Sequence, residues 1–211
     1  MGVQVRINGA NLSFPHLFER HAAVEGGRAT YQCELILDAS NPAVQLLDEA
    51  SRKVALEKFG AERGPLMPSA AKRGEMVNQQ KQMKGKPPRP EINGKVVISA
   101  SDEHSVMLFD EHGKAYLNVD TDMGAAAWLR GMQAKLTPGC IVNAIVDVYA
   151  FAVPANSGIT CGLRGIQFVR NTGPGVMDLG GAVPISKDAF GAVTETSASD
   201  LVGNPAVDGL I

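Results

Sequence analysis

The sequence has no long hydrophobic run and few aromatic residues. None of its 211 residues lies in an apolar stretch of the about 18 residues that a membrane-spanning helix requires. The N-terminal residues also lack the basic segment and apolar block of a secretory signal peptide. Although aromatic side chains make up only 5% of the chain, 45% of the residues are hydrophobic, so a globular core is available. We therefore expect a folded protein with no membrane contact.

Cysteine is scarce, and its spacing suits neither a disulfide framework nor a metal site. The three cysteines are Cys33, Cys140 and Cys161. Each lies in an apolar or strand-like segment, which indicates three buried free thiols. Unpaired thiols suit the reducing cytoplasm, where we expect the protein to act.

Signatures of catalysis and of cofactor binding are also missing. The sequence contains no nucleophile elbow, no phosphate-binding loop and no dinucleotide fingerprint. Its four histidines lack partners at metal-ligand spacing, and we expect them in solvated loops. Carboxylates stand beside histidines at 101–104 and 110–113, where strand ends and turns are predicted. We expect no enzymatic activity, no cofactor and no metal; an enzyme acting through Asp102, His104 or Asp110 is the weakest alternative.

Charge of both signs is present but unevenly spread. Residues 1–170 contain 19 basic and 17 acidic side chains, whereas residues 171–211 contain one basic and five acidic side chains. The densest basic segment, residues 72–95, holds seven Lys or Arg, two Glu and three prolines. A basic body with an acidic tail indicates a polyanion as the partner.

Hydrophobic alternation predicts strands in several parts of the chain. Strands are expected at 31–37 and 95–101, followed by a hairpin at 105–119. The strongest strand is 141–153, where the even positions are apolar and should face the core, while Tyr149 and Phe151 stand on the other face. A partner strand at about 159–171 returns after a turn, and its glycines indicate a bulge or a close backbone approach.

Two helices interrupt these strands. Asn41 and Pro42 predict the start of the first helix, and Gly60 predicts its end. The second helix is expected at about 122–136, because apolar residues recur there with a helical period. From 61 to 94 no period can be followed, so we expect a long basic loop insertion. After Asn171 the composition predicts a flexible acidic tail, 172–211.

This order of elements predicts a mainly β protein of α+β character. Short strands with a helix before the last two match a five-stranded Greek-key barrel, the OB-fold, here over residues 1–171. A generic α+β domain is the alternative.

Cations and flat side chains together can bind single-stranded nucleic acid. Cations follow the phosphates, and each base stacked on a ring contributes roughly 1–3 kcal/mol. The basic segment supplies cations, and the last hairpin supplies both kinds of side chain. A solvated basic loop and a core role for the aromatics are the alternatives. The expected nucleic-acid-binding residues are Lys72, Arg73, Lys81, Lys84, Lys86, Arg89, Lys95, Tyr149, Phe151, Arg164, Phe168 and Arg170.

Several segments resemble a family of bacteriophage proteins that bind single-stranded DNA. They are LSFPHLFE at 12–19, INGKVVISAS at 92–101, PGCIVNAIVDVYAF at 138–151 and GITCGLRGIQFVRN at 158–171. The resemblance spans roughly residues 5–172. It implies an OB-fold, no enzymatic activity, and a role in phage DNA replication, recombination or repair in the host cytoplasm. It carries over no list of DNA contacts.

The partners implied are single-stranded DNA and, through the tail, phage or host replication proteins. The tail departs from that of other single-stranded DNA-binding proteins, because it ends on Leu210 and Ile211 without a terminal aromatic residue. The alternative function is that of a phage structural or assembly protein that binds itself. The number of subunits is left open.

Overall fold

The computed structural model of the protein describes residues 2–22, 26–115, 123–153 and 156–172. The expected tail therefore lies outside the described residues, apart from Thr172. The strands are β1 (Val3–His21), β2 (Thr30–Asp38), β3 (Lys72–Arg73), β4 (Lys95–Asp102), β5 (Met107–Phe109), β6 (Ile141–Val153) and β7 (Asn156–Arg170). The helices are α1 (Pro42–Arg63), α2 (Gly74–Met83) and α3 (Met123–Lys135), with 3-10 turns η1 (Gly64–Leu66) and η2 (Pro90–Ile92).

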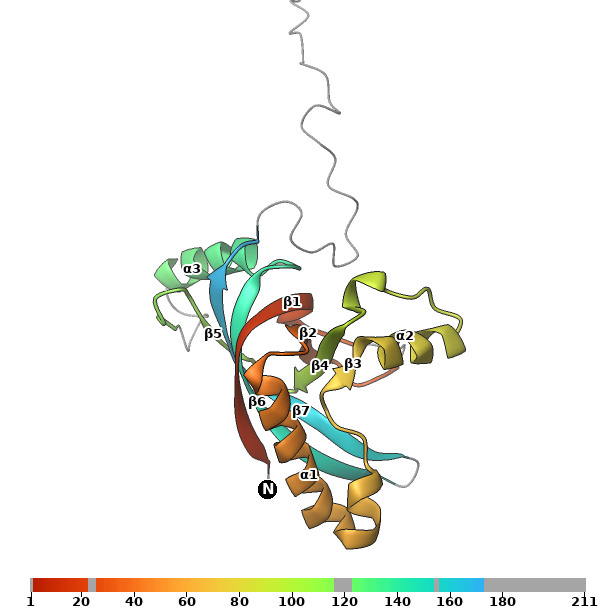
Figure 1. Ribbon diagram of the computed structural model, residues 1–211. Coiled ribbons are helices and arrows are strands. Elements are labelled where there is room, and N and C mark those ends of the chain that lie inside the picture. Colours follow the sequence, from red (N-terminus) through yellow and green to blue (C-terminus); the bar gives the residue numbers. More distant parts are fainter. Residues whose placement is uncertain (1, 23–25, 116–122, 154–155, 173–211) are drawn as a thin grey trace, which may run out of the picture. The chain divides into compact units, whose positions relative to one another are not determined.

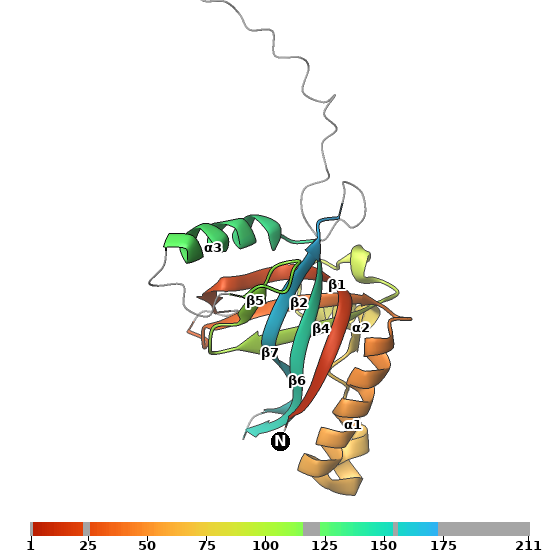
Figure 2. The ribbon, with the colours of Figure 1, turned by 90° about the vertical axis from the view of Figure 1, so that its left-hand side faces the viewer.

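Five of the strands close into a barrel (Figures 1 and 2). The sheet order is β3-β4-β2-β1-β6-β7-β5, and a parallel pairing of β4 with β7 joins the two sides. The other barrel pairs, β1–β2, β1–β6, β2–β4 and β6–β7, are antiparallel. β3 and β5 are added at the edges. This connectivity confirms the expected five-stranded barrel of the OB-fold.

The barrel is filled by the inward side chains of its strands. In β6 the even residues Val142, Ala144, Val146 and Val148 are buried, as alternation predicts. Residues from β1, β2, β4 and β7 complete the same cluster. Cys33, Cys140 and Cys161 are buried free thiols, as expected.

Both predicted helices are present. Asn41 caps α1 by accepting a hydrogen bond from the Ala43 N–H at 2.9 Å, and α1 packs on β6 and β1. Gly60 breaks the helical path with φ of 75°, after which the chain makes one further turn. α3 covers one end of the barrel, where Met132 and Leu136 are buried in the core (Figure 2). No helix among the described residues is long and apolar enough to cross a membrane.

The expected loop at 61–94 contains regular structure instead. The end of α1, then η1, β3, α2 and η2, occupy this segment. η2 places Ile92 against Ile36 and Val97, which forms a second small core on the outside of the barrel. α2 begins at Gly74, where an added Cβ would lie 1.7 Å from the Ile92 carbonyl oxygen. The prediction of a long irregular loop was wrong, because the contacts that order this segment join residues distant in sequence.

The hairpin expected at 105–119 is only partly present. β5 pairs in parallel with β7, and an isolated bridge joins Phe109 to Ala115. The predicted turn at 110–113 is confirmed: the Asp110 carboxylate accepts hydrogen bonds from the backbone N–H groups of His112 and Lys114. Residues 116–119 lie outside the described part.

Candidate nucleic-acid interface

Two neighbouring hollows on the outside of the barrel share Ser101, and we call them together the groove. The Phe14 hollow has a volume of about 460 Å³ and the Tyr149 hollow about 340 Å³. The first is lined by Phe14, His16, His21, Gln32, Cys33, Glu34, Lys86, Ser99, Ala100, Ser101 and Thr160. The second is lined by Thr30, Ser101, Asp102, Glu103, His104, Tyr149, Gly162 and Arg164.

The floor of the groove is formed by outward residues of β2, β4 and β7. Gln32 lies opposite Ser101, and Glu34 lies opposite Ser99. Ser101 is level with Gly162 of β7. The floor therefore offers hydrogen-bonding groups from serine, glutamine and glutamate side chains, and Gly162 leaves the face of β7 open beside the Tyr149 ring.

Phe14 lines the Phe14 hollow with an unusual backbone conformation, and the sequence analysis did not predict it as a binding residue. It has φ of 45°, the only positive value for a non-glycine residue in the described part of the chain. The pairing of β1 with β2 shifts register between Ser13 and His16, so Phe14 lies in a bulge. Its side chain is 50% exposed. The available signal was Pro15 inside an otherwise strand-like segment, since proline in a strand is confined to edges and bulges.

Arg89 lies beneath this bulge and is not free to meet a phosphate. The residue is 7% exposed. Its guanidinium donates to Glu34 at 2.5 Å, to Glu91 at 2.7 Å and to Ser13 Oγ at 3.1 Å. Burial by itself lowers the pKa of Arg89, but the bonds to the two carboxylates raise it above the ordinary value. The expected phosphate contact through Arg89 is therefore corrected: burial and two ion pairs occupy the group.

His16 and His21 also line the Phe14 hollow, which corrects their expected place in solvated loops. Their rings are stacked, with centroids 4.0 Å apart and planes 8° from parallel. Burial and the neighbouring His21 lower the pKa of His16. The stacked imidazole pair gives the hollow a second flat surface besides the Phe14 ring.

Tyr149 supplies the exposed ring of the Tyr149 hollow. It is 39% exposed, and burial raises the pKa of its phenol. Arg164 reaches the same hollow and donates to Asp147 at 2.6 Å and to Asp102 at 3.0 Å. Both predicted residues are thus brought together, but the Arg164 charge is largely met by its own carboxylates.

Phe168 lies inside the barrel, contrary to the expectation that it stacks on bases. Its exposure is 6%. The pairing of β6 with β7 shifts register between Ile145 and Val146, so that Arg164 falls in a bulge. Before the bulge the odd residues of β7 face the core, and after it the even residues do. Strict alternation along β7, which ignores the bulge, therefore assigned Phe168 to the wrong face of the sheet.

Five of the remaining predicted cations lie around the groove. Lys86 lines the Phe14 hollow, and Lys81 lies 5.9 Å from the Phe14 ring centroid. Burial lowers the pKa of Lys81, and the nearby Arg89 charge lowers it further. Lys84 is exposed just after α2. Exposed Lys72 and Arg73 form β3, beside the part of β4 that precedes the floor.

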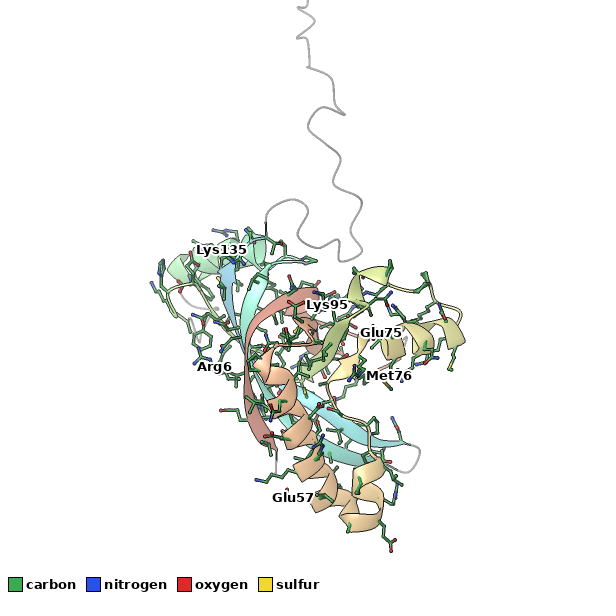
Figure 3. The ribbon with its side chains drawn as sticks, viewed as in Figure 1. Arg6, Glu57, Glu75, Met76, Lys95 and Lys135 are labelled. Atoms are coloured by element: carbon green, nitrogen blue, oxygen red, sulfur yellow. The ribbon has the colours of Figure 1, made fainter. Side chains whose placement is uncertain are left out.

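Three further predicted residues stand outside both hollows. Lys95 forms an ion pair with Asp38 at the start of β4, near Glu75 of α2 (Figure 3). Arg170 is exposed at the end of β7. Phe151 is half-buried over Gly158 near the tip of the β6–β7 hairpin.

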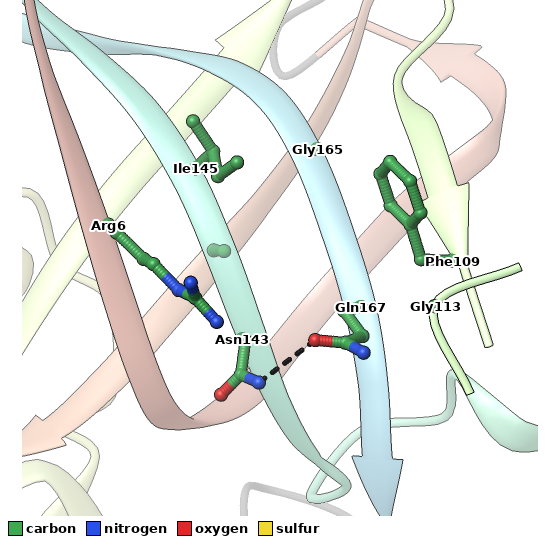
Figure 4. A pocket seen from close by; sticks show the side chains of 8 residues that line it. Arg6, Phe109, Gly113, Asn143, Ile145, Gly165 and Gln167 are labelled. Atoms are coloured by element: carbon green, nitrogen blue, oxygen red, sulfur yellow. Dashed lines mark hydrogen bonds between the residues drawn. The ribbon is translucent and has the colours of Figure 1, made fainter. Parts of the chain in front are cut away.

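A separate cavity of about 270 Å³ lies on the outer face of β6 and β7 (Figure 4). The side-chain amides that line this cavity form hydrogen bonds between neighbouring segments. Asn143 donates to Gln167 at 3.1 Å and accepts from the Gly9 N–H at 3.1 Å, and Gln167 donates to the Asp110 carbonyl. In the described ranges, no group of three or more His, Cys, Asp or Glu residues could hold a metal ion.

Comparison with protein families shows a match over residues 3–202 to the family described as Enterobacter phage Enc34, ssDNA-binding protein. No curated protein matches the chain significantly in sequence.

Among solved structures, the chain is similar to the single-stranded DNA-binding protein of bacteriophage Enc34. The structure of that protein in complex with single-stranded DNA has 17% identity and a TM-score of 0.64, covering 81% of this chain and 88% of that chain. Its C-terminally truncated form has 15% identity and a TM-score of 0.62 over the same shares. These likenesses support the barrel fold.

Proposed function

The chain belongs to the family of the Enterobacter phage Enc34 single-stranded DNA-binding protein, and from this premise we propose that it binds single-stranded DNA in phage replication, recombination or repair. The binding is largely independent of sequence. The observation that carries the proposal is the groove, with an exposed ring in each of its two hollows and cations at its rim.

The groove lies where this fold is suited to bind a strand. OB-folds bind oligonucleotides on the face of the second and third barrel strands, which here are β2 and β4. Glu34 and Asp102 lie in the hollows, where they would repel phosphates. We infer that the bases face the floor, stacked at Phe14 and Tyr149, while the phosphates follow the rim near Lys81, Lys84 and Lys86.

The proposed function needs no chemical step. The carboxylates that stand beside histidines have structural uses: Asp102 accepts from Arg164 and from the His104 N–H, and Asp110 closes the turn at 110–113. We further propose the host cytoplasm as the site of action, and contact with phage or host replication proteins through the tail.

Titration of a fluorescent oligo-dT at several salt concentrations tests the proposal. For about three to six neutralised phosphates, the logarithm of the association constant should fall against the logarithm of salt concentration with a slope of about −2 to −4. Light scattering of the free protein tests the alternative of self-assembly. Salt-independent binding, or large assemblies with no DNA affinity, would contradict the proposal.

Phe14→Ala should weaken binding about 5-fold to 150-fold, because one stacked base contributes about 1–3 kcal/mol. The matched control is Leu66→Ala, which removes an exposed apolar side chain that does not line the groove and should leave the affinity unchanged. Equal affinities of the Phe14→Ala variant and the unsubstituted protein would rule out stacking at Phe14.

A further inference from the structure

We propose that Arg89 is a positioning residue that holds Phe14 in place as a stacking platform and does not itself contact DNA. Residues 74–94, which we call the clamp, serve to place the Arg89 guanidinium under the Phe14 bulge. The inference rests on the proposed function and adds to it a residue that supports the groove from behind.

The charge around Arg89 argues against a phosphate contact. One buried guanidinium is bonded to two partly buried carboxylates, Glu34 and Glu91, so these three groups together carry a formal charge of −1. A phosphate that approached it would be repelled, and burial denies it access. The same ion pairs fix the orientation of the guanidinium, because a buried charge that loses its partners is strongly disfavoured.

The clamp fixes the backbone of Arg89 as well. Asn78 of α2 donates to the Arg89 carbonyl at 2.7 Å and accepts from the Arg89 N–H at 2.7 Å. Asn78 also donates to Asn93 at 2.9 Å. Gly74 lets the start of α2 approach the backbone of η2 closely, since an added Cβ would lie 1.7 Å from the Ile92 carbonyl oxygen. Both ends of Arg89, backbone and guanidinium, are therefore held.

Arg89 in turn contacts two consecutive residues at the bulge. Its guanidinium donates to Ser13 Oγ, and its central carbon lies 4.8 Å from the centroid of the Phe14 ring. A bulky residue with positive φ persists only where its surroundings hold it. These contacts hold the bulge while half of the Phe14 side chain stays exposed to the Phe14 hollow.

The physical benefit is preorganisation. A free phenylalanine side chain loses rotamer freedom when a base stacks on it, and that loss weakens binding. A ring already held over a fixed guanidinium loses less. Arg89 would thus raise the affinity for DNA without adding a cation to the binding surface.

A salt titration combined with a double-mutant cycle tests this inference on the full-length chain. With oligo-dT as the probe, Arg89→Met should weaken binding about 5-fold to 20-fold, with an unchanged slope against salt concentration. The double variant Phe14→Ala/Arg89→Met should bind no more weakly than Phe14→Ala, because the two residues act as one unit.

Lys84→Met is the matched control, since Lys84 is an exposed cation beside the clamp. It should reduce the magnitude of the slope by about 0.7 and combine multiplicatively with Phe14→Ala. If Arg89→Met instead reduces the slope as Lys84→Met does, or combines multiplicatively with Phe14→Ala, Arg89 is a DNA contact or an unrelated residue and the inference is wrong.

Two further measurements keep the inference testable. If Arg89→Met fails to fold, Arg89→Lys replaces it, because a lysine cannot reach Glu34, Glu91 and Ser13 at once. NMR of the DNA-free protein with labelled phenylalanine should show averaged, narrower Phe14 ring signals in either variant; unaltered signals would contradict the inference. Failure of the unsubstituted protein to bind oligo-dT would remove the proposed function, independently of these signals.

Discussion

At the scale of single residues, two rings and one stacked imidazole pair define the proposed binding surface. Tyr149 belongs to a strand face that alternation predicts correctly. Phe14 and the pair of His16 and His21 lie on β1, around the bulge and near its end, where alternation gives no guidance. Arg164 and Arg89, both expected on phosphates, are paired with the protein's own carboxylates.

Tyr149 should act through its ring and not through its hydroxyl. Tyr149→Phe is expected to keep the affinity for oligo-dT within about twofold, whereas Tyr149→Ala should lower it about 5-fold to 150-fold. Fluorescence anisotropy of labelled oligo-dT measures both. A Tyr149→Phe variant as weak as Tyr149→Ala would indicate a hydrogen bond from the phenol as the main contact.

His16 should make the stability of the folded protein depend on pH. The pKa of His16 is lowered in the folded protein, so the unfolded chain binds this proton more readily, and stability falls as pH drops below the unfolded value of about 6.5. The melting temperature should be lower at pH 5.5 than at pH 7.5, and His16→Gln should reduce this difference. His112→Gln, at an exposed turn, is the control and should not alter the loss; equal losses in both variants would exclude His16 as the cause.

At the scale of elements, the clamp converts a basic segment into a support for the groove. It consists of the short helix α2 and the turn η2, which follow the edge strand β3 and pack on the outside of β4 and β2. Lys84 and Lys86 face solvent, Lys81 lies partly buried beside the Phe14 ring, and the buried Arg89 faces the bulge of β1. The clamp thus combines two roles, cations at the rim and support for Phe14.

Gly74→Ala should release the clamp while leaving the barrel intact. The added Cβ would collide with the Ile92 carbonyl at 1.7 Å, so residues 74–94 must shift. We expect faster hydrogen exchange confined to the clamp, and weaker DNA binding of at least severalfold. The control is Gly131→Ala in α3, where an added Cβ meets nothing within 4 Å and alanine favours the helix by about 0.5–1 kcal/mol. Unchanged exchange in Gly74→Ala would show that the clamp tolerates the methyl group.

At the scale of the whole molecule, the net charge of the first 170 residues is opposite in sign to that of the last 41. Residues 1–170 carry two more basic than acidic side chains, whereas residues 171–211 carry four more acidic than basic ones. An acidic segment joined to a DNA-binding domain competes with phosphates for cations at high effective concentration.

Deletion of residues 172–211 should therefore leave the affinity for oligo-dT equal or higher, with the largest gain at low salt, where screening is weakest. Anisotropy titrations of the full-length and shortened chains at two salt concentrations measure this. A large loss of affinity on deletion would mean that the tail itself helps to hold DNA.

The sequence by itself determined β2, β4, β6 and β7, the capped start of α1 and the barrel, because alternation and capping act between neighbours in the chain. It did not predict β1 or β3. Only the tertiary structure decided which other side chains join Tyr149, Arg164 and Lys86 in the groove. Bulges in β1 and β7 change which residues face outward. As a result Phe14 faces solvent and Phe168 faces the core. Arg89 meets its partner Glu34 across 55 residues. Such pairings depend on where strands lie in space, and no local pattern records them.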